Sequence, residues 1–384
     1  MPADLARERA EGAPGRALDC ELVFGEDSEL RVAHVDCDAF HVSCELLRRP
    51  ELRGKAVVVA GGGPRAVVTT ASYEARRFGV GSAMPAARAR RLCPHAIFLT
   101  PDFPTYRAIS KTLMDVVRAH VERVEVVGLD EAYLDLDGFF SPRAAMRRIV
   151  AEIERETGLT CSVGIGPNKL VAKVASDAEK PRGFVTLTRE QACARFAGAS
   201  PRLLPGIGPK TAATLAQLGL STIDAVAAAP EALLASRFGP RQGLDLARRV
   251  RFEHDGPVTP VREVVSESRE RTFDVDIAGV ETLASELRRM AVELCDSLAA
   301  HRRMGRTIAI KVRLDDFSTA TRAKTIAEAT CDPDVVAGLA VQLLREYDPP
   351  RPVRLLGVRV GGFAAAAAGR GAALRDDPQL ALPL

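Results

Sequence analysis

The sequence predicts a soluble, multidomain α+β protein, and three observations support this fold class. The chain has 384 residues, of which 47% are hydrophobic and 27% charged, so it is long enough for roughly two to four globular domains. Before residue 189, short apolar strands alternate with amphipathic helices in the order strand, helix, hairpin, helix, strand. A wholly helical pattern follows from Arg189 to Asp255, and a second strand-and-helix unit begins after the linker Gly256–Pro260.

The composition excludes several classes of protein. The formal net charge of +3 does not by itself indicate a polyanionic partner, so clustering of charge must carry that argument. Eight scattered cysteines without a Cys-x-x-Cys pair argue against a zinc module and favour reduced thiols. No apolar run reaches the length of a membrane span, and the polar N-terminus lacks a signal-peptide core. We therefore expect a cytoplasmic protein that does not enter a membrane.

The elements of the first unit follow from apolar runs and helix caps. A strand over residues 30–35 ends at Asp36, and the helix that follows stops before Pro50. Ser72 is a typical N-cap and Gly79 a typical C-terminal stop for a short helix. The expected strands are 30–35, 55–60, 66–70, 124–127, 132–137 and 160–165, and the expected helices are 40–47, 73–78, 105–121 and 142–156.

The second unit and the chain ends are read in the same way. Its expected strands are 264–273, 307–314, 324–329 and 353–360, and its expected helices are 279–302 and 333–347. Residues 1–28 are charged and lack periodicity, which predicts a flexible extension. Residues 364–384 form a low-complexity, flexible tail that ends in the peptide QLALPL.

Three carboxylates are candidates for a metal site. Asp130 and Glu131 stand at the start of a strand after a turn at Gly128, and Asp36 ends a strand far upstream. Because successive strand side chains point to opposite faces, the turn must reorient one of the adjacent pair before both can reach one site. Such a set can hold two Mg²⁺ ions that also bind substrate phosphates. Solvated surface carboxylates are the competing interpretation.

A second set of residues has the chemistry of phosphate binding. Tyr73 and Arg76 lie three residues apart on a short helix and so share a face. The Arg76 guanidinium can grip phosphate oxygens bidentately, Thr70 and Tyr73 can add hydroxyls, and Lys180 can add a point charge. Each residue alone is more often solvated or structural; it is the combination that indicates a nucleotide.

Two further segments indicate DNA. Gly206 and Gly208 form a Gly-x-Gly turn that opens a helix, and with Lys210 behind it this is the helix-hairpin-helix pattern that holds duplex phosphates. The segment 302–324 has a local excess of five positive charges. Within it Lys311 and Arg313 share one strand face and Arg306 precedes the strand. An ordinary helical corner and a solvated charged edge are the alternatives.

These motifs together match a family. From about residue 31 to 363 the chain resembles the Y-family translesion DNA polymerases, most closely those of the bacterial DNA polymerase IV type. The resemblance rests on HVDCDAF (34–40), TTASYEARRFGV (69–80), SAMP (82–85), LDEAYLD (129–135), AKVASD (172–177), the helix-hairpin-helix and ERTF (270–273), in that order.

The resemblance implies a right-hand polymerase architecture with a ferredoxin-like palm. The implied parts are a palm (29–40 and 102–188), fingers (41–101), a helix-hairpin-helix thumb (189–255), a linker (256–264) and an α+β little finger (265–363). Asp36, Asp130 and Glu131 fall on the catalytic, metal-binding carboxylates, and the main-chain carbonyl of Cys37 completes that set. Tyr73, Arg76 and Lys180 fall on residues that hold the incoming triphosphate.

The implied reaction is template-directed, low-fidelity attack of a primer 3′-hydroxyl on a deoxynucleoside triphosphate, with two Mg²⁺ ions or alternatively Mn²⁺. The implied partners are primer-template DNA, the nucleotides and the replication sliding clamp, and the enzyme would act as a monomer. The clamp-binding residues would be Gln379, Leu380, Leu382 and Leu384, since apolar residues on a flexible tail suit such docking.

One departure from the family pattern bears on the substrate. The family carries Phe or Tyr where this chain has His41, and that aromatic ring excludes ribonucleotides. A polar imidazole could bond a 2′-hydroxyl instead, so we expect relaxed sugar discrimination. The alternative function is an inactive DNA-repair adaptor that binds DNA and the clamp; the three retained acids disfavour it. A generic helix-hairpin-helix DNA-binding module is a further rival, but it would leave both acidic motifs without a purpose.

Overall fold

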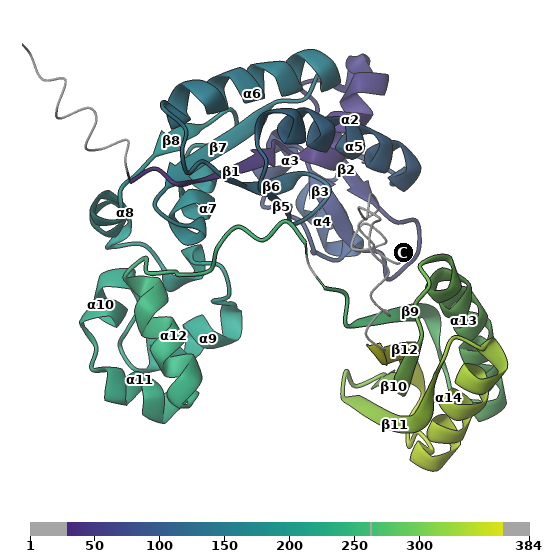
Figure 1. The fold of residues 1–384 in the computed structure, drawn as a ribbon. Coiled ribbons are helices and arrows are strands. Elements are labelled where there is room, and N and C mark those ends of the chain that lie inside the picture. Colours follow the sequence, from purple (N-terminus) through teal and green to yellow (C-terminus); the bar gives the residue numbers. More distant parts are fainter. Residues whose placement is uncertain (1–28, 262, 364–384) are drawn as a thin grey trace, which may run out of the picture.

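The computed structural model describes residues 29–261 and 263–363 (Figure 1). The expected N-terminal extension and the tail with its clamp-binding peptide lie outside these residues. Within them, a unit with a five-stranded sheet is joined to a small three-stranded unit, a helical unit and a C-terminal four-stranded unit. None of the helices in this described part of the chain is long and apolar enough to span a membrane.

The five-stranded sheet has the order β5-β6-β1-β7-β8. Its central strand β1 (Val32–Cys37) runs antiparallel to both β6 (Glu131–Asp135) and β7 (Cys161–Gly166). The edge strands are β5 (Val124–Val126) and β8 (Phe184–Thr186). The chain order β1-α5-β5-β6-α6-β7 is the β-α-β-β-α-β arrangement of a ferredoxin-like sheet, as expected from the sequence.

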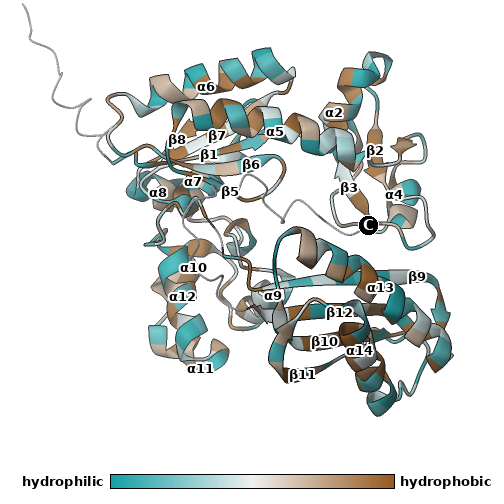
Figure 2. Cartoon of the chain, turned by 45° about the vertical axis from the view of Figure 1, so that its right-hand side comes forward, coloured by the Kyte–Doolittle hydropathy of each residue, from teal (hydrophilic) through white to brown (hydrophobic). Residues whose placement is uncertain are grey.

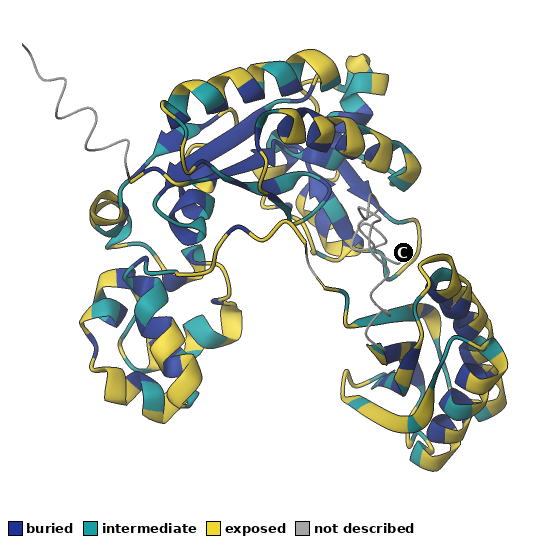
Figure 3. Cartoon of the chain, viewed as in Figure 1, coloured by how far each residue is buried: buried dark blue, intermediate teal, exposed yellow. Residues whose placement is uncertain are grey.

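Helices cover both faces of this sheet. On one face, α5 (Phe103–His120) and α6 (Pro142–Thr157) pack with Ala33, Val35 and Cys37 of β1 in the main hydrophobic core. Side chains alternate along a strand, so His34 and Asp36 face the other side, which is covered by α7 (Lys169–Ala178). Figure 3 shows the strands dark blue and the outer sides of α5 and α6 exposed, whereas α7 is largely buried.

Helix α7 was not among the expected elements, and it packs unusually close to the sheet. A Cβ atom at Gly164 in β7 would lie 2.0 Å from the carbonyl oxygen of Ala172 and 2.3 Å from the nitrogen of Ser176. Glycine is therefore required at residue 164, because any side chain would push α7 away. This close approach brings the polar side chains of α7 within reach of β1.

The three-stranded unit has the order β3-β2-β4, with β2 (Val57–Ala60), β3 (Val68–Ala71) and β4 (Ile97–Leu99). It also carries α3 (Tyr73–Arg76) and α4 (Ala86–Leu92), and α2 (Phe40–Arg48) connects it to β1. Ser72 caps α3 as predicted, since its side chain accepts a hydrogen bond from the backbone of Ala75. The helix ends two residues earlier than expected.

The segment from Arg189 to Asp255 is helical, as predicted. It comprises α8 (Arg189–Phe196), the 3-10 turn η2 (Pro201–Leu203), α9 (Pro209–Gln217), α10 (Ile223–Ala228), α11 (Glu231–Phe238) and α12 (Pro240–Val250). Its core is continuous with the side of α7 that faces away from the sheet, through Leu170, Val174 and neighbouring residues. Helix α7 thus connects the site described below to the helical unit.

The C-terminal unit is an antiparallel sheet in the order β11-β10-β12-β9, backed on one face by α13 (Val280–Ala300) and α14 (Pro333–Tyr347). Its strands are β9 (Ser266–Ile277), β10 (Gly305–Leu314), β11 (Thr319–Thr330) and β12 (Val353–Phe363). In Figure 2 the strands and helices of this unit alternate between hydrophobic and hydrophilic residues, as expected where each element buries one side. The expectation that Arg306 precedes the strand was wrong: it lies within β10, beside a bulge between Gly305 and Thr307.

Polar contacts tie the C-terminal unit and its linker to the rest of the chain. Arg65, in the loop between β2 and β3, forms an ion pair of 2.6 Å with Asp276 of β9. In the linker, the backbone nitrogen of Thr259 donates to Glu125 Oε2 at 2.8 Å, and Glu125 is in turn paired with Lys169. The helical and C-terminal units lie on one side of the five-stranded sheet and leave an open arch between them (Figure 1).

Candidate active site

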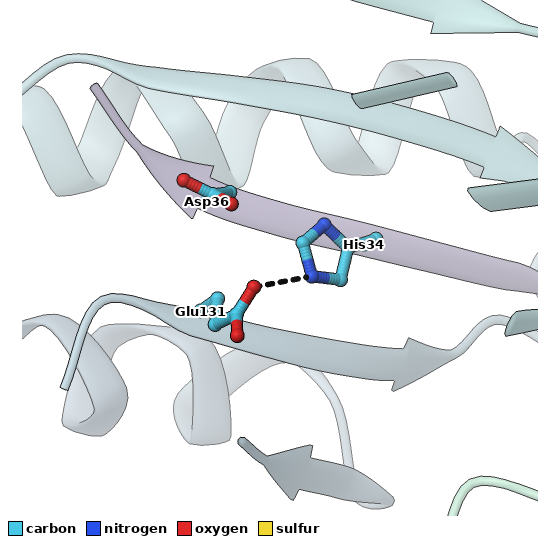
Figure 4. A group of neighbouring side chains, drawn as sticks. All are labelled: His34, Asp36 and Glu131. Atoms are coloured by element: carbon cyan, nitrogen blue, oxygen red, sulfur yellow. Dashed lines mark ion pairs between the residues drawn. The ribbon is translucent and has the colours of Figure 1, made fainter. Parts of the chain in front are cut away.

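Two of the predicted carboxylates meet across neighbouring strands. Asp36 near the end of β1 is directly opposite Glu131 at the start of β6, and both side chains lie on the α7 face of the sheet (Figure 4). Asp130 precedes the strand, and its carbonyl oxygen accepts a hydrogen bond of 3.0 Å from the Cys37 nitrogen. The ends of β1 and β6 thus bring all three acidic residues to one edge of the sheet.

A pocket of about 110 Å³ opens at this edge. Its lining contains two of the acids, Asp36 and Asp130, whereas Glu131 is not part of the lining. It also contains all four predicted nucleotide-binding residues, Thr70, Tyr73, Arg76 and Lys180, together with Cys37, Ala39, Phe40 and Ser82. Residues separated by more than 100 positions in the sequence therefore share one polar cavity.

Two lysines hold the carboxylates in this structure. Lys173 Nζ lies 2.9 Å from Asp36 Oδ2 and 2.8 Å from Glu131 Oε2. Lys180 Nζ lies 2.8 Å from Asp36 Oδ1 and 2.8 Å from Asp177 Oδ1. Burial opposes charge on both amines, but the neighbouring carboxylates outweigh it and raise the pKa of each lysine. Both lysines are therefore ammonium cations at neutral pH.

The acids themselves differ in protonation. Burial, followed by the negative charges of Asp36 and Glu131, raises the pKa of Asp130 to about 7. Burial also acts to raise the pKa of Glu131, but contact with His34 and the charge of Lys173 outweigh it and hold that pKa well below the usual range. Asp130 therefore carries the least compensated negative charge of the site.

His34 and Lys173 also belong to the site, although no role was predicted for either residue from the sequence. His34 is fully buried, its Nδ1 lies 2.8 Å from Ser176 Oγ, and its Nε2 lies 3.2 Å from Glu131 Oε2. Ligand atoms of His34, Asp36 and Glu131 all lie within 4.8 Å of one another. Burial lowers the pKa of His34. The spacing of two residues between His34 and Asp36 was an available signal, because it places both on one face of the strand.

Asp38, the second acid of the same motif, has a structural role. It is buried and accepts hydrogen bonds from Thr160 Oγ1 at 2.7 Å, Ser162 Oγ at 2.7 Å and the Arg182 nitrogen at 3.0 Å. These donors come from β7, the residue before it and the segment after α7. A carboxylate with this many protein donors fastens β1 to its neighbours rather than binding a ligand.

The nucleotide-binding candidates are held by local contacts. The Arg76 guanidinium stacks on the Tyr73 ring at 4.7 Å, and its Nε donates to the carbonyl oxygen of Ala71 at 2.9 Å. Burial raises the pKa of Tyr73 to about 12, so its hydroxyl stays a donor. Thr70 lines the pocket, but its hydroxyl already bonds Nδ1 of His41 at 3.0 Å. Its expected contact with phosphate therefore competes with His41.

The predicted DNA-binding residues lie in the helical and C-terminal units. Gly206 has φ +87, Gly208 is the N-cap of α9, and Lys210 is exposed in its first turn. Along β10, Lys311 and Arg313 share the face opposite α13 and α14, as expected from strand alternation. Lys311 pairs with Glu270 at 2.7 Å and Arg313 bonds Thr319 at 3.0 Å. Arg306 is exposed.

Comparison with known proteins gives consistent matches. The model of the impB/mucB/samB family matches residues 35–177, and that of the impB/mucB/samB family C-terminal domain matches residues 265–374. The chain is 43% identical to DNA polymerase IV of Streptomyces coelicolor, over 87% of this chain and 71% of that protein. It is 41% identical to DNA polymerase IV of Methanoculleus marisnigri, over 86% and 93%.

Two solved structures are also similar. A Y-family DNA polymerase chimera of Dbh and Dpo4 superposes with a TM-score of 0.77 at 27% identity, covering 86% of this chain and 98% of the chimera. DinB from Sulfolobus solfataricus gives a TM-score of 0.59 at 27% identity, over 86% and 98%. The similarity thus extends across all the units described above.

Proposed function

Because this chain belongs to the impB/mucB/samB family of Y-family DNA polymerases, of the DNA polymerase IV type, it is a DNA-directed DNA polymerase, and we propose how its own residues carry out the reaction. Its fold class is the right-hand architecture of that family, with a ferredoxin-like palm. We assign the palm to residues 29–40 and 102–188, the fingers to 41–101, the thumb to 189–255 and the little finger to 265–363. Primer-template DNA and deoxynucleoside triphosphates are its substrates.

The observation that carries the proposal is the shared pocket. Asp36 and Asp130 line it together with Tyr73, Arg76 and Lys180, and Glu131 stands directly opposite Asp36. The carboxylates proposed to bind metal ions therefore lie beside positively charged side chains and hydroxyl groups that suit a triphosphate. Arg76 and Tyr73 come from a helix of the fingers, whereas the acids come from the palm, so an incoming nucleotide would bridge the two.

The donor set fits a hard divalent cation. It consists of oxygens alone, from Asp36, Asp130, Glu131 and the main-chain carbonyl of Cys37, as Mg²⁺ prefers. The two ammonium groups held against these acids, and the raised pKa of Asp130, indicate a site that needs more positive charge than it has. When bound there, two Mg²⁺ ions would neutralise phosphate charge and favour ionisation of the primer 3′-hydroxyl.

The protein side chains bind and orient the substrates. Arg76 can donate two parallel hydrogen bonds to phosphate oxygens, and the Tyr73 hydroxyl can donate one. Lys180 must exchange its partner Asp36 for a phosphate oxygen, which it can do at little cost because one anion replaces another. We infer from the family that small fingers leave the templating position open, which would suit bypass of damaged bases.

Sugar selection is the finer part of the proposal. His41 stands where the family carries a larger aromatic residue, and its imidazole is bonded to Thr70. We propose that this arrangement accepts a ribose more readily than a phenyl ring would. We also propose that Gln379, Leu380, Leu382 and Leu384 bind the sliding clamp.

Primer extension with Mg²⁺ tests the proposal. The parent protein should extend a primer on an undamaged template. The activity of the double variant Asp130→Ala plus Glu131→Ala should be lower by at least about a thousandfold, because the proposed role of both acids is in the reaction itself. Lys111→Ala, on an exposed part of α5, is the control and should extend as the parent does. Equal extension by parent and double variant would show that these two acids do not carry the reaction, and no extension by either would favour the inactive adaptor.

A further inference from the structure

We propose that His34 and Ser176 are positioning residues that hold Glu131 for cation binding. This inference rests on the proposed function, since it concerns how tightly the same carboxylates bind a divalent cation. Both residues lie outside the pocket lining, and their contacts run from α7 through β1 to β6.

The first step is the position of the imidazole. His34 is fully buried between β1 and α7, its ring packs against Tyr133 at 4.7 Å between centroids, and its Nδ1 lies 2.8 Å from Ser176 Oγ. Ser176 is itself buried. Ser176 lies on α7, which packs closely against the sheet over Gly164, so the His34 ring has little freedom to turn.

The second step concerns the proton of Ser176. Its Oγ lies 2.8 Å from His34 Nδ1 and also 2.8 Å from the carbonyl oxygen of Lys173, but a hydroxyl has a single proton to donate. If that proton went to Lys173, a neutral His34 would have to donate from Nδ1. Its Nε2 lone pair would then face Glu131 Oε2 at 3.2 Å.

The favoured arrangement is therefore the opposite one. Ser176 donates to Nδ1, which places the imidazole proton on Nε2 and directs it to Glu131. Among the described residues no atom forms a well-aligned hydrogen bond with the buried Nε2 in this structure. Glu131 Oε2 is the carboxylate oxygen that lies against it, at 3.2 Å, and we assign this oxygen as its partner. Ser176 thereby sets the tautomer, as partners behind a metal-binding site commonly do.

The two carboxylate oxygens of Glu131 have different contacts. Both His34 Nε2 and Lys173 Nζ contact Oε2. With Oε2 held twice, the carboxylate cannot rotate freely, and Oε1 is left for another ligand. Loss of either contact should let the carboxylate turn, which weakens cation binding without removing a ligand.

The test measures Mg²⁺ binding to the full-length protein by calorimetry, alongside the Mg²⁺ concentration for half-maximal primer extension. Ser176→Ala should weaken Mg²⁺ binding and raise the half-maximal concentration by about tenfold, a usual loss for such partners. The maximal rate at saturating Mg²⁺ should change much less. His34→Leu should lose more, and His34→Gln should recover most of the affinity because its amide can still donate to Glu131.

Ser110→Ala is the matched control, since Ser110 is a buried serine on α5 and is not among the residues that line the pocket. Thermal melting and DNA affinity show whether a variant is folded; should His34→Leu fail to fold, Ser176→Ala decides. An affinity within twofold of the parent in Ser176→Ala would overturn the inference. That result is distinct from failure of the proposed function, in which the parent itself would not extend primers.

Discussion

His41 Nδ1 lies 3.0 Å from Thr70 Oγ1, and this bond joins the first helix after β1 to the strand β3 of the neighbouring unit. The imidazole also packs edge-on against Phe40, Phe103 and Tyr106. The side chain proposed to select the sugar is therefore held in place rather than free to swing. Two predictions concern this residue.

The first concerns selectivity. His41→Phe should raise the preference for deoxy- over ribonucleotides, measured as the ratio of kcat/KM for matched nucleotides, by about tenfold or more, because a phenyl ring is larger and cannot bond a 2′-hydroxyl. Single-nucleotide incorporation on one template measures the ratio. The prediction would be wrong if the parent rejected ribonucleotides as strongly as the variant.

The second concerns acid stability. Burial lowers the pKa of His41 from 6.5 to about 4, so the folded state favours neutral His41. The stability this contributes is complete above the unfolded pKa and is lost as pH falls from 6.5 through 4. Between about pH 7.5 and pH 5 the parent should lose about 2 kcal/mol of unfolding free energy relative to His41→Phe. Denaturant titrations of both proteins measure the difference, and parallel pH profiles would contradict it.

A third prediction concerns the packing of α7. Gly164→Ala should lower the free energy of unfolding by about 3 kcal/mol or more, because its Cβ would overlap the backbone of Ala172 and Ser176. Gly198→Ala is the control, since a Cβ there meets nothing within 4 Å. Because α7 carries Lys173 and Ser176, the surviving folded protein should also bind Mg²⁺ more weakly. Equal denaturation midpoints for the two variants would disprove the packing argument.

A fourth prediction concerns the helix-hairpin-helix. If Lys210 contacts a phosphate, Lys210→Ala should weaken DNA binding about equally for all sequences and reduce the slope of log K against log salt by about 0.9. Fluorescence anisotropy over a series of salt concentrations gives that slope. Lys111→Ala, which removes an equal charge from α5, should leave the slope unchanged; a matching decrease in both variants would mean that only bulk charge matters.

A fifth prediction concerns the pair Arg65 and Asp276, which connects the loop between β2 and β3 to β9 of the C-terminal unit. Arg65→Asp should place two negative charges together and increase the mean distance between fluorophores on the two units. The exchange variant Arg65→Asp plus Asp276→Arg should restore the parent distance. High salt should reduce the difference in distance between the Arg65→Asp variant and the parent, because the pair is only partly buried. If the distance in the Arg65→Asp variant equals that in the parent, other contacts hold the two units together.

The sequence predicted the elements well where a local signal was strong. Ser72 caps its helix, the segment 189–255 is helical, and Lys311 and Arg313 share a strand face, because caps and periodicity are properties of neighbouring residues. Helix α7 was missed and the position of Arg306 was wrong. In both places the deciding factor is tertiary: close packing of α7 over Gly164 of β7, and a bulge where β10 pairs with β11.

For the site, the sequence by itself determined which residue types are present: three acids, hydroxyl and cationic residues that suit a phosphate, and a histidine at the position proposed to select the sugar. It identified the family through motifs whose order needs no coordinates. Only the tertiary structure decided which groups touch. It placed Asp36 opposite Glu131 on neighbouring strands, and it surrounded Asp38 with hydrogen-bond donors of the protein. It also brought His34, Lys173 and Ser176 behind Glu131. Such pairings depend on strand register and helix docking, which join residues more than 40 positions apart.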